Sequence, residues 1–249
     1  SMAEALGMSL TGCAAIPGPY KQRGQMAYET GRRIVEMVWE DLRPSKILTR
    51  AAFENSIVAA SALGASTNCP PHVNAIARHA GVELLNADWD KQGYDIPLLV
   101  NCMPAGKYLG EAFYRAGGVP AVMAELLAHG KLRGEAMTVT GRTMAENLAA
   151  APRADGEVIK SYDRPMLQQA GFAVLSGNLF DSAIMKTSVI SPEFRAKYLE
   201  RKGDPDAFEG TAIVFEGPED YHHRINDPSL PIDENSILFI RNTGPVGYP

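Results

Sequence analysis

Three short polar side chains stand next to each other in the first half of this sequence and form its best local candidate for a binding site. Ser66, Thr67 and Asn68 come shortly before Pro70 and Pro71, a pair that suits the first turn of a helix. Backbone N–H groups at a helix start, together with hydroxyl and amide side chains, can hold a carboxylate or a phosphate. The same residue types also act as ordinary helix caps. On the residues alone the two interpretations are equally favoured.

A nucleophilic role for the same segment has less support. Ser66 and His72 supply a hydroxyl and an imidazole for a hydrolase, but no carboxylate can be named that would orient the imidazole. The sequence also contains no serine nucleophile elbow, phosphate-binding loop or dinucleotide fingerprint.

No metal ligand is predicted within this chain. Cys13, Cys69 and Cys102 lie far apart and beside small or apolar residues, which indicates buried structural thiols. Asp88–Asp95 has the early spacing of a calcium loop but lacks its later carboxylates. Three widely spaced cysteines further predict reduced thiols and a cytoplasmic protein.

The stretch Gly171–Ser188 predicts a local fold and carries no chemistry of its own. Two short apolar runs flank a polar turn, which predicts a strand, a turn and a second strand. The turn contains Gly177 and Asn178, which tolerate left-handed or tight backbone conformations.

The elements around these candidates change in character along the chain. The first part alternates helices with a few apolar strands, and the continuous apolar run Ile96–Asn101 is typical of a buried parallel strand. Ala136–Thr140 is predicted as a short strand. Gln25–Leu42 is predicted as a helix with apolar residues on one side and charged residues on the other. These features predict an α/β fold.

Strand-like runs with Gly, Pro and Asp between them dominate after Pro152. We therefore predict an α/β domain over residues 1–155 and a compact, barrel-like β-domain over residues 156–249.

The overall composition excludes several classes of protein. The chain has 249 residues, 45% of them hydrophobic, and a formal net charge of −5. Its basic residues are scattered, so no nucleic-acid partner is predicted. No apolar run reaches the ~20 residues that a membrane span requires, so no membrane association is predicted.

Seven segments in register resemble the family of dihydroxy-acid, phosphogluconate and sugar-acid dehydratases. They are Gly64–Val82, Pro97–Tyr108, Arg115–Leu127, Thr138–Ala149, Gly171–Ser188, Gly210–Asp220 and Ile237–Pro249. Within the family, the segments Ser1–Tyr20, Phe113–Gly118 and Gly247–Pro249 are most similar to the pentonate branch, which acts on sugar acids such as L-arabinonate and D-xylonate.

The resemblance implies a fold and a reaction. The fold would be the latter part of a three-layer α/β/α N-terminal domain followed by part of a β-barrel-like C-terminal domain. The reaction would be loss of water from a 2,3-dihydroxy acid to give a 2-keto-3-deoxy acid. A 2Fe–2S cluster would act as the Lewis acid, Mg²⁺ would hold the carboxylate and the 2-hydroxyl, and a serine would remove the α-proton. The resemblance also implies a homodimer or homotetramer.

The same resemblance implies that the catalytic groups lie outside this chain. The cluster cysteines and most magnesium ligands would precede Ser1, and the base serine would follow Pro249. The chain is thus expected to be an internal part of the enzyme, inactive alone, with no catalytic residue and no metal ligand of its own.

The remaining candidates would then line the substrate pocket. These are Ser66, Thr67, Asn68, Gly177 and Asn178. Lys107 and Lys186 could attract an anionic sugar acid, although lysines are usually surface residues. Two alternatives stay open, a dihydroxy-acid dehydratase of branched-chain amino-acid synthesis and a non-catalytic binding module.

Overall fold

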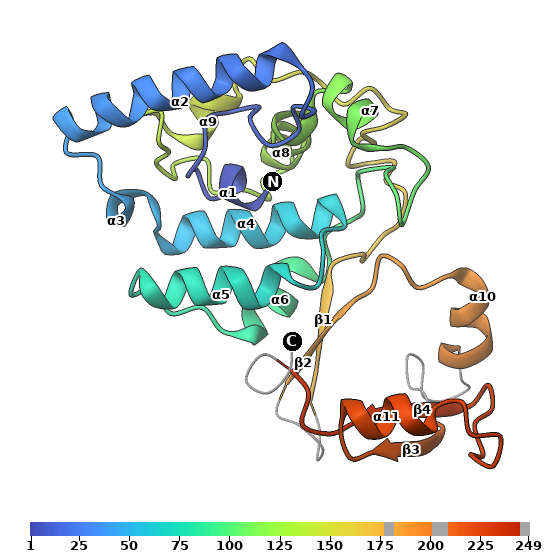
Figure 1. Cartoon of the computed structure of the whole chain (residues 1–249). Coiled ribbons are helices and arrows are strands. Elements are labelled where there is room, and N and C mark those ends of the chain that lie inside the picture. The colour runs from blue at the N-terminus through green and yellow to red at the C-terminus, as the bar shows by residue number, and fades with distance from the viewer. Residues whose placement is uncertain (177–181, 201–208, 245–249) are drawn as a thin grey trace. The chain divides into compact units, whose positions relative to one another are not determined.

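The computed structural model describes residues 1–176, 182–200 and 209–244 (Figure 1). The chain divides into two compact units, residues 1–189 and 190–249. This division reflects packing within the chain, and the predicted domain bounds 1–155 and 156–249 stay a prediction. Within the described residues, no helix is both long enough and apolar enough to cross a membrane.

The first unit is mainly helical and carries one small sheet. Its elements are α1 (Met2–Ala5), α2 (Lys21–Trp39), α3 (Pro44–Ile47), α4 (Arg50–Leu63), α5 (Cys69–His79), α6 (Asn86–Gly93), α7 (Gly110–Arg115), α8 (Gly118–Ala128), α9 (Met144–Leu148), β1 (Phe172–Leu175) and β2 (Ala183–Lys186). β1 and β2 pair in antiparallel fashion, with Phe172 opposite Lys186.

Helix α4 forms the centre of the first unit (Figure 1). Its sequence is almost free of charge after the first turn, and the side chains from Ala52 to Ala62 are nearly all buried. Helices α1, α5, α6 and α8 pack around it. A helix that is apolar on all sides belongs in a core, and here α4 joins the two main hydrophobic clusters.

The run Ile96–Asn101 is buried as predicted, but its pairing differs. Leu98 and Val100 form antiparallel bridges to Leu167 and Ile159. A continuous apolar run reports burial on both faces, and it carries no information about the direction of its neighbour. The prediction of a parallel strand was therefore wrong in direction.

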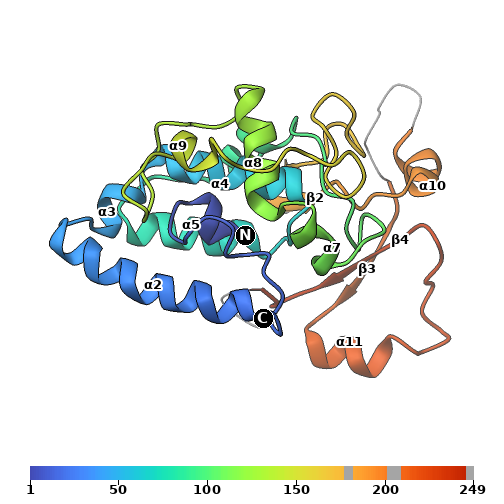
Figure 2. The same cartoon turned by 90° about the horizontal axis from the view of Figure 1, so that it is seen from above.

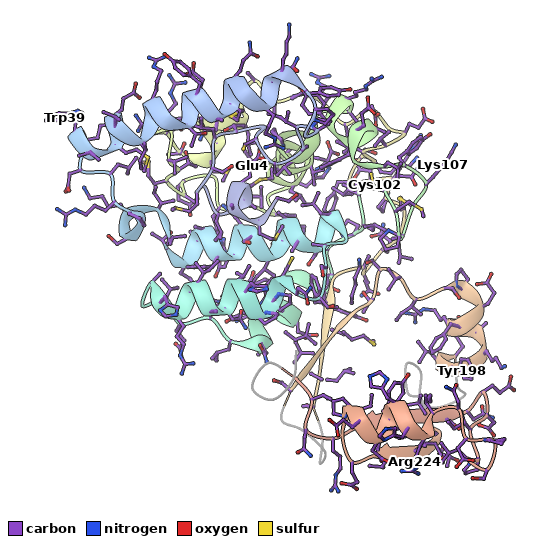
Figure 3. The ribbon with its side chains drawn as sticks, in the orientation of Figure 1. Glu4, Trp39, Cys102, Lys107, Tyr198 and Arg224 are labelled. Atoms are coloured by element: carbon purple, nitrogen blue, oxygen red, sulfur yellow. The ribbon has the colours of Figure 1, made fainter. Side chains whose placement is uncertain are left out.

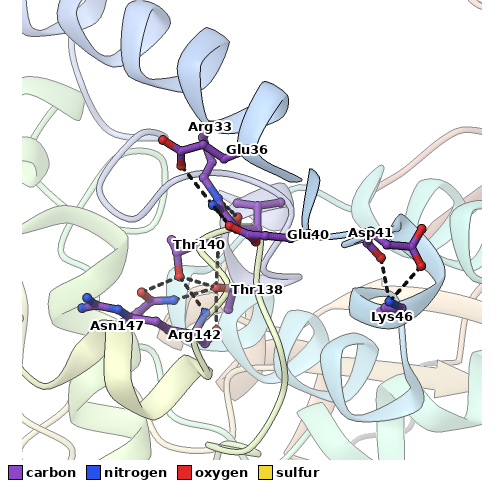
Figure 4. Close-up of polar contacts among 10 residues, drawn as sticks. Arg33, Glu36, Glu40, Asp41, Lys46, Thr138, Thr140, Arg142 and Asn147 are labelled. Carbon is purple, nitrogen blue, oxygen red and sulfur yellow. Dashed lines mark hydrogen bonds and ion pairs between the residues drawn. The ribbon is translucent and has the colours of Figure 1, made fainter. Parts of the chain in front are cut away.

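The predicted strand Ala136–Thr140 is a turn in the structure, with one isolated bridge between Met137 and Thr143. The Thr138 hydroxyl donates to the Arg142 carbonyl at 2.9 Å, and Asn147 donates to the Thr138 hydroxyl at 2.7 Å (Figure 4). Such local side-chain hydrogen bonds compete with a sheet ladder, which explains the missing strand.

The second unit contains α10 (Pro192–Phe194), the π-helical turn η1 (Arg195–Leu199), β3 (Thr211–Phe215), α11 (Pro218–Arg224) and β4 (Ser236–Ile240). Strands β3 and β4 are parallel, with Thr211 opposite Ser236. Helix α11 lies between them in sequence and packs Tyr221 against the buried Phe215 ring.

Helices combined with two small sheets are consistent with the predicted α/β fold. The described strands form two separate two-stranded sheets. The three-layer arrangement and the barrel stay predictions.

Candidate functional site

The predicted polar segment lies in the connection between α4 and α5. Helix α4 ends at Gly64, which has the left-handed conformation φ 59°, ψ 44°. A Cβ atom at this position would lie 2.8 Å from Leu98 Cδ1. Glycine is therefore required both by the backbone conformation and by the close approach of Leu98.

Ser66, Thr67 and Asn68 are all exposed in this loop. The Ser66 hydroxyl accepts a hydrogen bond from the Asn68 N–H at 3.2 Å. Asn68 occupies the N-cap position of α5 but its side chain forms no capping hydrogen bond. The side chain of Asn68 therefore does not cap the helix, and ligand binding by Thr67 and Asn68 stays a prediction.

The backbone at this helix start contributes less than the sequence suggested. The Cys69 N–H donates to the Ser66 carbonyl at 2.9 Å, and Pro70 and Pro71 have no N–H group. The His72 N–H donates to the Asn68 carbonyl at 3.4 Å. The first turn of α5 thus has few spare backbone donors, and side chains must supply the hydrogen bonds to a bound anion.

Lys186 supplies a positive charge at the same loop. It is the last residue of β2, and its Nζ donates a 2.6 Å hydrogen bond to the Gly64 carbonyl. The residue is half-buried, and burial lowers its pKa from the ordinary value. No acidic side chain within the described ranges forms an ion pair with it. Its charge is therefore available to an anionic ligand.

Cys69, the first residue of α5, interacts electrostatically with Lys186. Burial raises the pKa of the Cys69 thiol, while the Lys186 charge acts on it in the opposite direction. A raised thiol pKa makes Cys69 a poor nucleophile at neutral pH. This residue is therefore a structural neighbour of the loop.

The position of Lys186 is fixed by the packing of strands β1 and β2 against α6. Phe172, opposite Lys186 on β1, is buried and contacts the Trp89 indole edge-on with ring centroids 5.2 Å apart. A Cβ atom at Gly171 would lie only 1.8 Å from the Gly93 carbonyl oxygen, so only glycine allows β1 to approach α6 this closely. The Thr187 hydroxyl adds a 2.7 Å hydrogen bond to the Gly171 carbonyl.

Ser188 is a buried polar residue beside this loop that the sequence analysis did not single out. It is 6% exposed, and its hydroxyl has no hydrogen-bond partner among the described residues. Its Oγ lies 3.5 Å from the position that a Gly64 Cβ would occupy. The only signal in the sequence is its place at the polar end of a strand.

A hollow of about 290 Å³ adjoins the loop through Ala65. Ser1, Cys102 and Tyr108 also line it, together with apolar side chains of the α4 and α7 ends. Figure 3 labels Cys102, one of the residues that line this hollow. The volume of this hollow is near the lower end of the range for small-molecule sites. A larger hollow of about 830 Å³ lies between α2 and α9, but Thr140 and Asn147 on its wall are hydrogen-bonded to each other.

The side chains of the remaining predicted residues have no contact with this loop that the structure describes. Gly177 and Asn178 lie outside the described residues. The Lys107 ammonium lies 5.1 Å from the ring centroid of its neighbour Tyr108. His72 is exposed, and no carboxylate in the described part of the chain bonds to it. The Ser66–His72 hydrolase therefore gains no support.

No metal centre is formed by the described residues, which contain no group of three or more His, Cys, Asp or Glu side chains able to hold an ion. Cys13, Cys69 and Cys102 are free thiols. The side chains described here do not fit an iron–sulfur cluster or a magnesium ion.

Comparison with known proteins identifies the family. The family model described as dihydroxy-acid/6-phosphogluconate dehydratase N-terminal matches residues 1–147, and the corresponding C-terminal model matches residues 157–249. The chain therefore belongs to the dihydroxy-acid/6-phosphogluconate dehydratase family. This confirms the family predicted from the seven motifs.

Three relatives show how similar the chain is to individual members of the family. The chain is 59% identical over its whole length to a D-xylonate dehydratase from Caulobacter vibrioides and covers 42% of that protein. It is 45% identical to an L-arabinonate dehydratase from Rhizobium leguminosarum over 99% of the chain and 41% of the relative. A dihydroxy-acid dehydratase from Nocardioides is 39% identical over the whole chain and 42% of the relative. The chain thus spans about two fifths of the length of these relatives.

Proposed function

We propose that the full-length protein is a sugar-acid dehydratase that converts a pentonate, such as D-xylonate or L-arabinonate, into its 2-keto-3-deoxy acid. The observation that carries the proposal is the difference in identity between relatives. Identity is 59% to the protein named D-xylonate dehydratase but 39% to the dihydroxy-acid dehydratase over the same 249 or so residues. We take the higher overall identity to the pentonate dehydratase as support for a similar substrate.

The chemistry of the loop between α4 and α5 supports this assignment. A pentonate carries one carboxylate, and each of its remaining carbons carries a hydroxyl. Its binding site therefore needs one positive charge and several hydrogen-bonding groups. Lys186 supplies the charge beside Gly64, and Thr67 and Asn68 supply exposed side chains with hydrogen-bonding capacity left over. In our proposal Lys186 attracts the carboxylate and Thr67 and Asn68 bind hydroxyls.

Ser66 has a supporting role in this proposal, because its hydroxyl and carbonyl fix the turn that presents Thr67 and Asn68. The proposed pocket also includes Gly177 and Asn178, on the grounds of the family resemblance.

We further propose that the complete enzyme carries a 2Fe–2S cluster and Mg²⁺ on groups that this chain does not contain. The residues described here supply no cluster or magnesium ligands, and their roles are limited to binding and orienting the sugar acid. We also propose a cytoplasmic enzyme, since its three cysteines are free thiols, and a homodimer or homotetramer.

Two alternatives make different predictions. A dihydroxy-acid dehydratase would prefer 2,3-dihydroxyisovalerate, whose branched apolar end has no hydroxyl for Thr67 or Asn68 to bind. A non-catalytic binding module would bind a sugar acid without turning it over.

The test is anaerobic purification of the full-length protein, followed by iron analysis and a keto-acid assay with D-xylonate, L-arabinonate, D-gluconate and 2,3-dihydroxyisovalerate. The proposal expects bound iron and the highest kcat/KM with a pentonate. Highest activity with 2,3-dihydroxyisovalerate would establish the first alternative. Binding of a pentonate with no keto-acid product would establish the second.

A further inference from the structure

The Gly64 carbonyl at the end of α4 relies on a side chain for its hydrogen bond. A helix leaves its last carbonyl groups without partners inside the helix. The Ala60 carbonyl accepts from the Ala65 N–H at 2.9 Å, as is common where a helix ends in a left-handed glycine. The Gly64 carbonyl instead accepts from Lys186 Nζ at 2.6 Å, and no second donor within the described ranges bonds to it. The ammonium that the proposed function assigns to the substrate is therefore already bonded to the protein.

The hydroxyl of Ser188 lies beside the same glycine and has no hydrogen-bond partner among the described residues. Ser188 follows Lys186 by two residues, and its Oγ lies 3.5 Å from the position that a Gly64 Cβ would occupy. Figures 1 and 2 show the end of β2, which leads into this segment, beside the end of α4. A buried hydroxyl without a hydrogen bond destabilises the fold. A bond formed in a second arrangement of the same groups would recover that cost.

The Ser188 oxygen is enclosed by this chain itself. The residue is 6% exposed, and its oxygen is covered by other described residues. A segment of the full-length protein outside this chain cannot reach the oxygen unless those residues move apart. A bond to the neighbouring Gly64 carbonyl needs a smaller change, because a serine hydroxyl changes direction by a rotation of about 120° about χ1. Lys186 and Ser188 are therefore two possible donors to one acceptor.

A sugar acid bound as proposed would draw Lys186 away from this acceptor. Lys186 is half-buried, whereas Thr67 and Asn68 are exposed. A ligand held by Thr67 and Asn68 therefore lies further out than the place where Nζ now bonds to the Gly64 carbonyl. The lysine side chain is a flexible four-carbon stem and can follow the ligand outward. The Gly64 carbonyl would then lose its donor.

We propose that Ser188 is a positioning residue, whose hydroxyl donates to the Gly64 carbonyl in place of Lys186 when Lys186 binds the carboxylate of a sugar acid. This inference rests on the proposed function, which assigns that carboxylate to Lys186. In the arrangement described, Lys186 holds the carbonyl and the Ser188 hydroxyl is unbonded. In the second arrangement, Nζ lies at the carboxylate and the hydroxyl holds the carbonyl. The end of α4 keeps this hydrogen bond in both, so the release of Lys186 costs less.

A double-mutant cycle in urea unfolding of the full-length protein tests the exchange without any substrate. Lys186→Met frees the Gly64 carbonyl permanently, so the Ser188 hydroxyl should bond to it in that variant. Ser188→Ala is therefore expected to lower the urea midpoint of the Lys186→Met protein, and to leave the midpoint unchanged or raise it when Lys186 is present.

The matched control for this cycle is Ser61→Ala. Ser61 is also buried, but its hydroxyl donates to the Ile57 carbonyl within α4 at 3.1 Å. Its removal should change the urea midpoint by the same amount with Lys186 and with Lys186→Met, because this hydrogen bond does not involve Gly64.

Steady-state kinetics of the full-length enzyme test the role in substrate binding. Ser188→Ala should raise KM for a pentonate about three- to tenfold and leave kcat nearly unchanged, because the missing hydrogen bond affects bound substrate and transition state alike. In the Lys186→Met enzyme the same substitution should leave KM unchanged, since no ammonium remains to be released. Ser61→Ala should leave KM unchanged in both.

The outcomes separate this proposal from the proposed function. Equal effects of Ser188→Ala on the urea midpoint with Lys186 and with Lys186→Met would overturn the exchange. A Ser188→Ala protein that is less stable than the wild type, or fails to fold, would also overturn it, because the hydroxyl is unbonded while Lys186 holds the carbonyl. A wild-type protein that neither binds nor converts a pentonate would refute the proposed function, and the urea cycle would still decide whether Lys186 and Ser188 exchange at Gly64.

Discussion

Replacement of Lys186 by methionine removes the positive charge that this residue places beside Gly64 and keeps most of the side-chain volume. The ammonium currently donates to the Gly64 carbonyl at 2.6 Å, and no ion pair within the described ranges occupies it. If this charge attracts the sugar-acid carboxylate, Lys186→Met weakens substrate binding. It also removes a hydrogen bond that holds the end of α4.

The size of the effect follows from the position of the charge. A carboxylate about 4 Å from Nζ would interact with it by about 4 kcal/mol at an effective dielectric constant of about 20. Lys186 is only half-buried, so solvent screening reduces the interaction to about 1–2 kcal/mol. We therefore expect kcat/KM for a pentonate to fall about tenfold. Since the charge acts on bound substrate and transition state alike, most of the change should appear in KM.

The assay is steady-state keto-acid formation by the full-length enzyme, with thermal unfolding measured in parallel. Lys186→Gln keeps a hydrogen-bond donor for the Gly64 carbonyl but not the charge, so it should stay as impaired as Lys186→Met if the charge binds substrate, whereas it should recover most of the loss if the role of Lys186 is purely structural. Lys131→Met, at an exposed lysine beside Tyr162, is the matched control and should behave as the wild type. A Lys186→Met enzyme with kcat/KM within about twofold of the wild type would refute the role of this charge.

The pH dependence gives a second check on Lys186. Because burial lowers the pKa of its ammonium, the charge is lost at a lower pH than for an exposed lysine. KM for the pentonate should therefore begin to rise below the ordinary lysine pKa, and this rise should be absent in Lys186→Met.

Three further predictions concern the framework of the first unit. Arg50 lowers the pKa of Asp88, so the ion pair stabilises the fold at pH values above the unfolded-state pKa of 3.8. This contribution disappears as the pH falls through the lower pKa of the folded state. Asp88→Asn should therefore lower the free energy of unfolding in urea by about 1–2 kcal/mol at pH 7 and leave it unchanged in strong acid. Phe172→Ala should cost about 3–5 kcal/mol, because it leaves a cavity against the buried Trp89 ring. Burial raises the pKa of Cys69, so iodoacetamide at pH 7 should alkylate it far more slowly in the folded protein than in urea.

Each of these predictions has a result that would contradict it. A destabilisation by Asp88→Asn that stays constant down to pH 2 would exclude the ion pair as its cause. A loss below about 1 kcal/mol for Phe172→Ala would show that β1 does not depend on this packing. Equal alkylation rates for folded and denatured protein would show that the Cys69 thiol is exposed.

The sequence predicts local features of this fold well. Residues whose conformation depends on near neighbours behave as expected, for example the end of α4 at Gly64 and the start of α5 at Pro70 and Pro71. The helix over Gln25–Leu42 is also present as α2. Its apolar side, however, is the exposed side, because amphipathic spacing identifies a face but not the partner that covers it.

Long-range contacts account for what could not be predicted. The position of Lys186 beside Gly64 joins residues 122 apart in sequence, and no local pattern in either segment indicates the contact. The direction of pairing at Leu98 likewise depends on the distant Leu167. For the candidate site, the sequence supplied the residue types Ser66–Asn68. Only the structure showed that the side chain of Asn68 does not cap its helix.

The most direct test of the account is a structure of the full-length protein with a bound pentonate. The account predicts that the carboxylate lies within hydrogen-bonding or ion-pair distance of Lys186 Nζ, and that at least one hydroxyl contacts the side chain of Thr67 or Asn68. A pentonate bound with no contact to Lys186 or to the loop from Gly64 to Asn68 would contradict it.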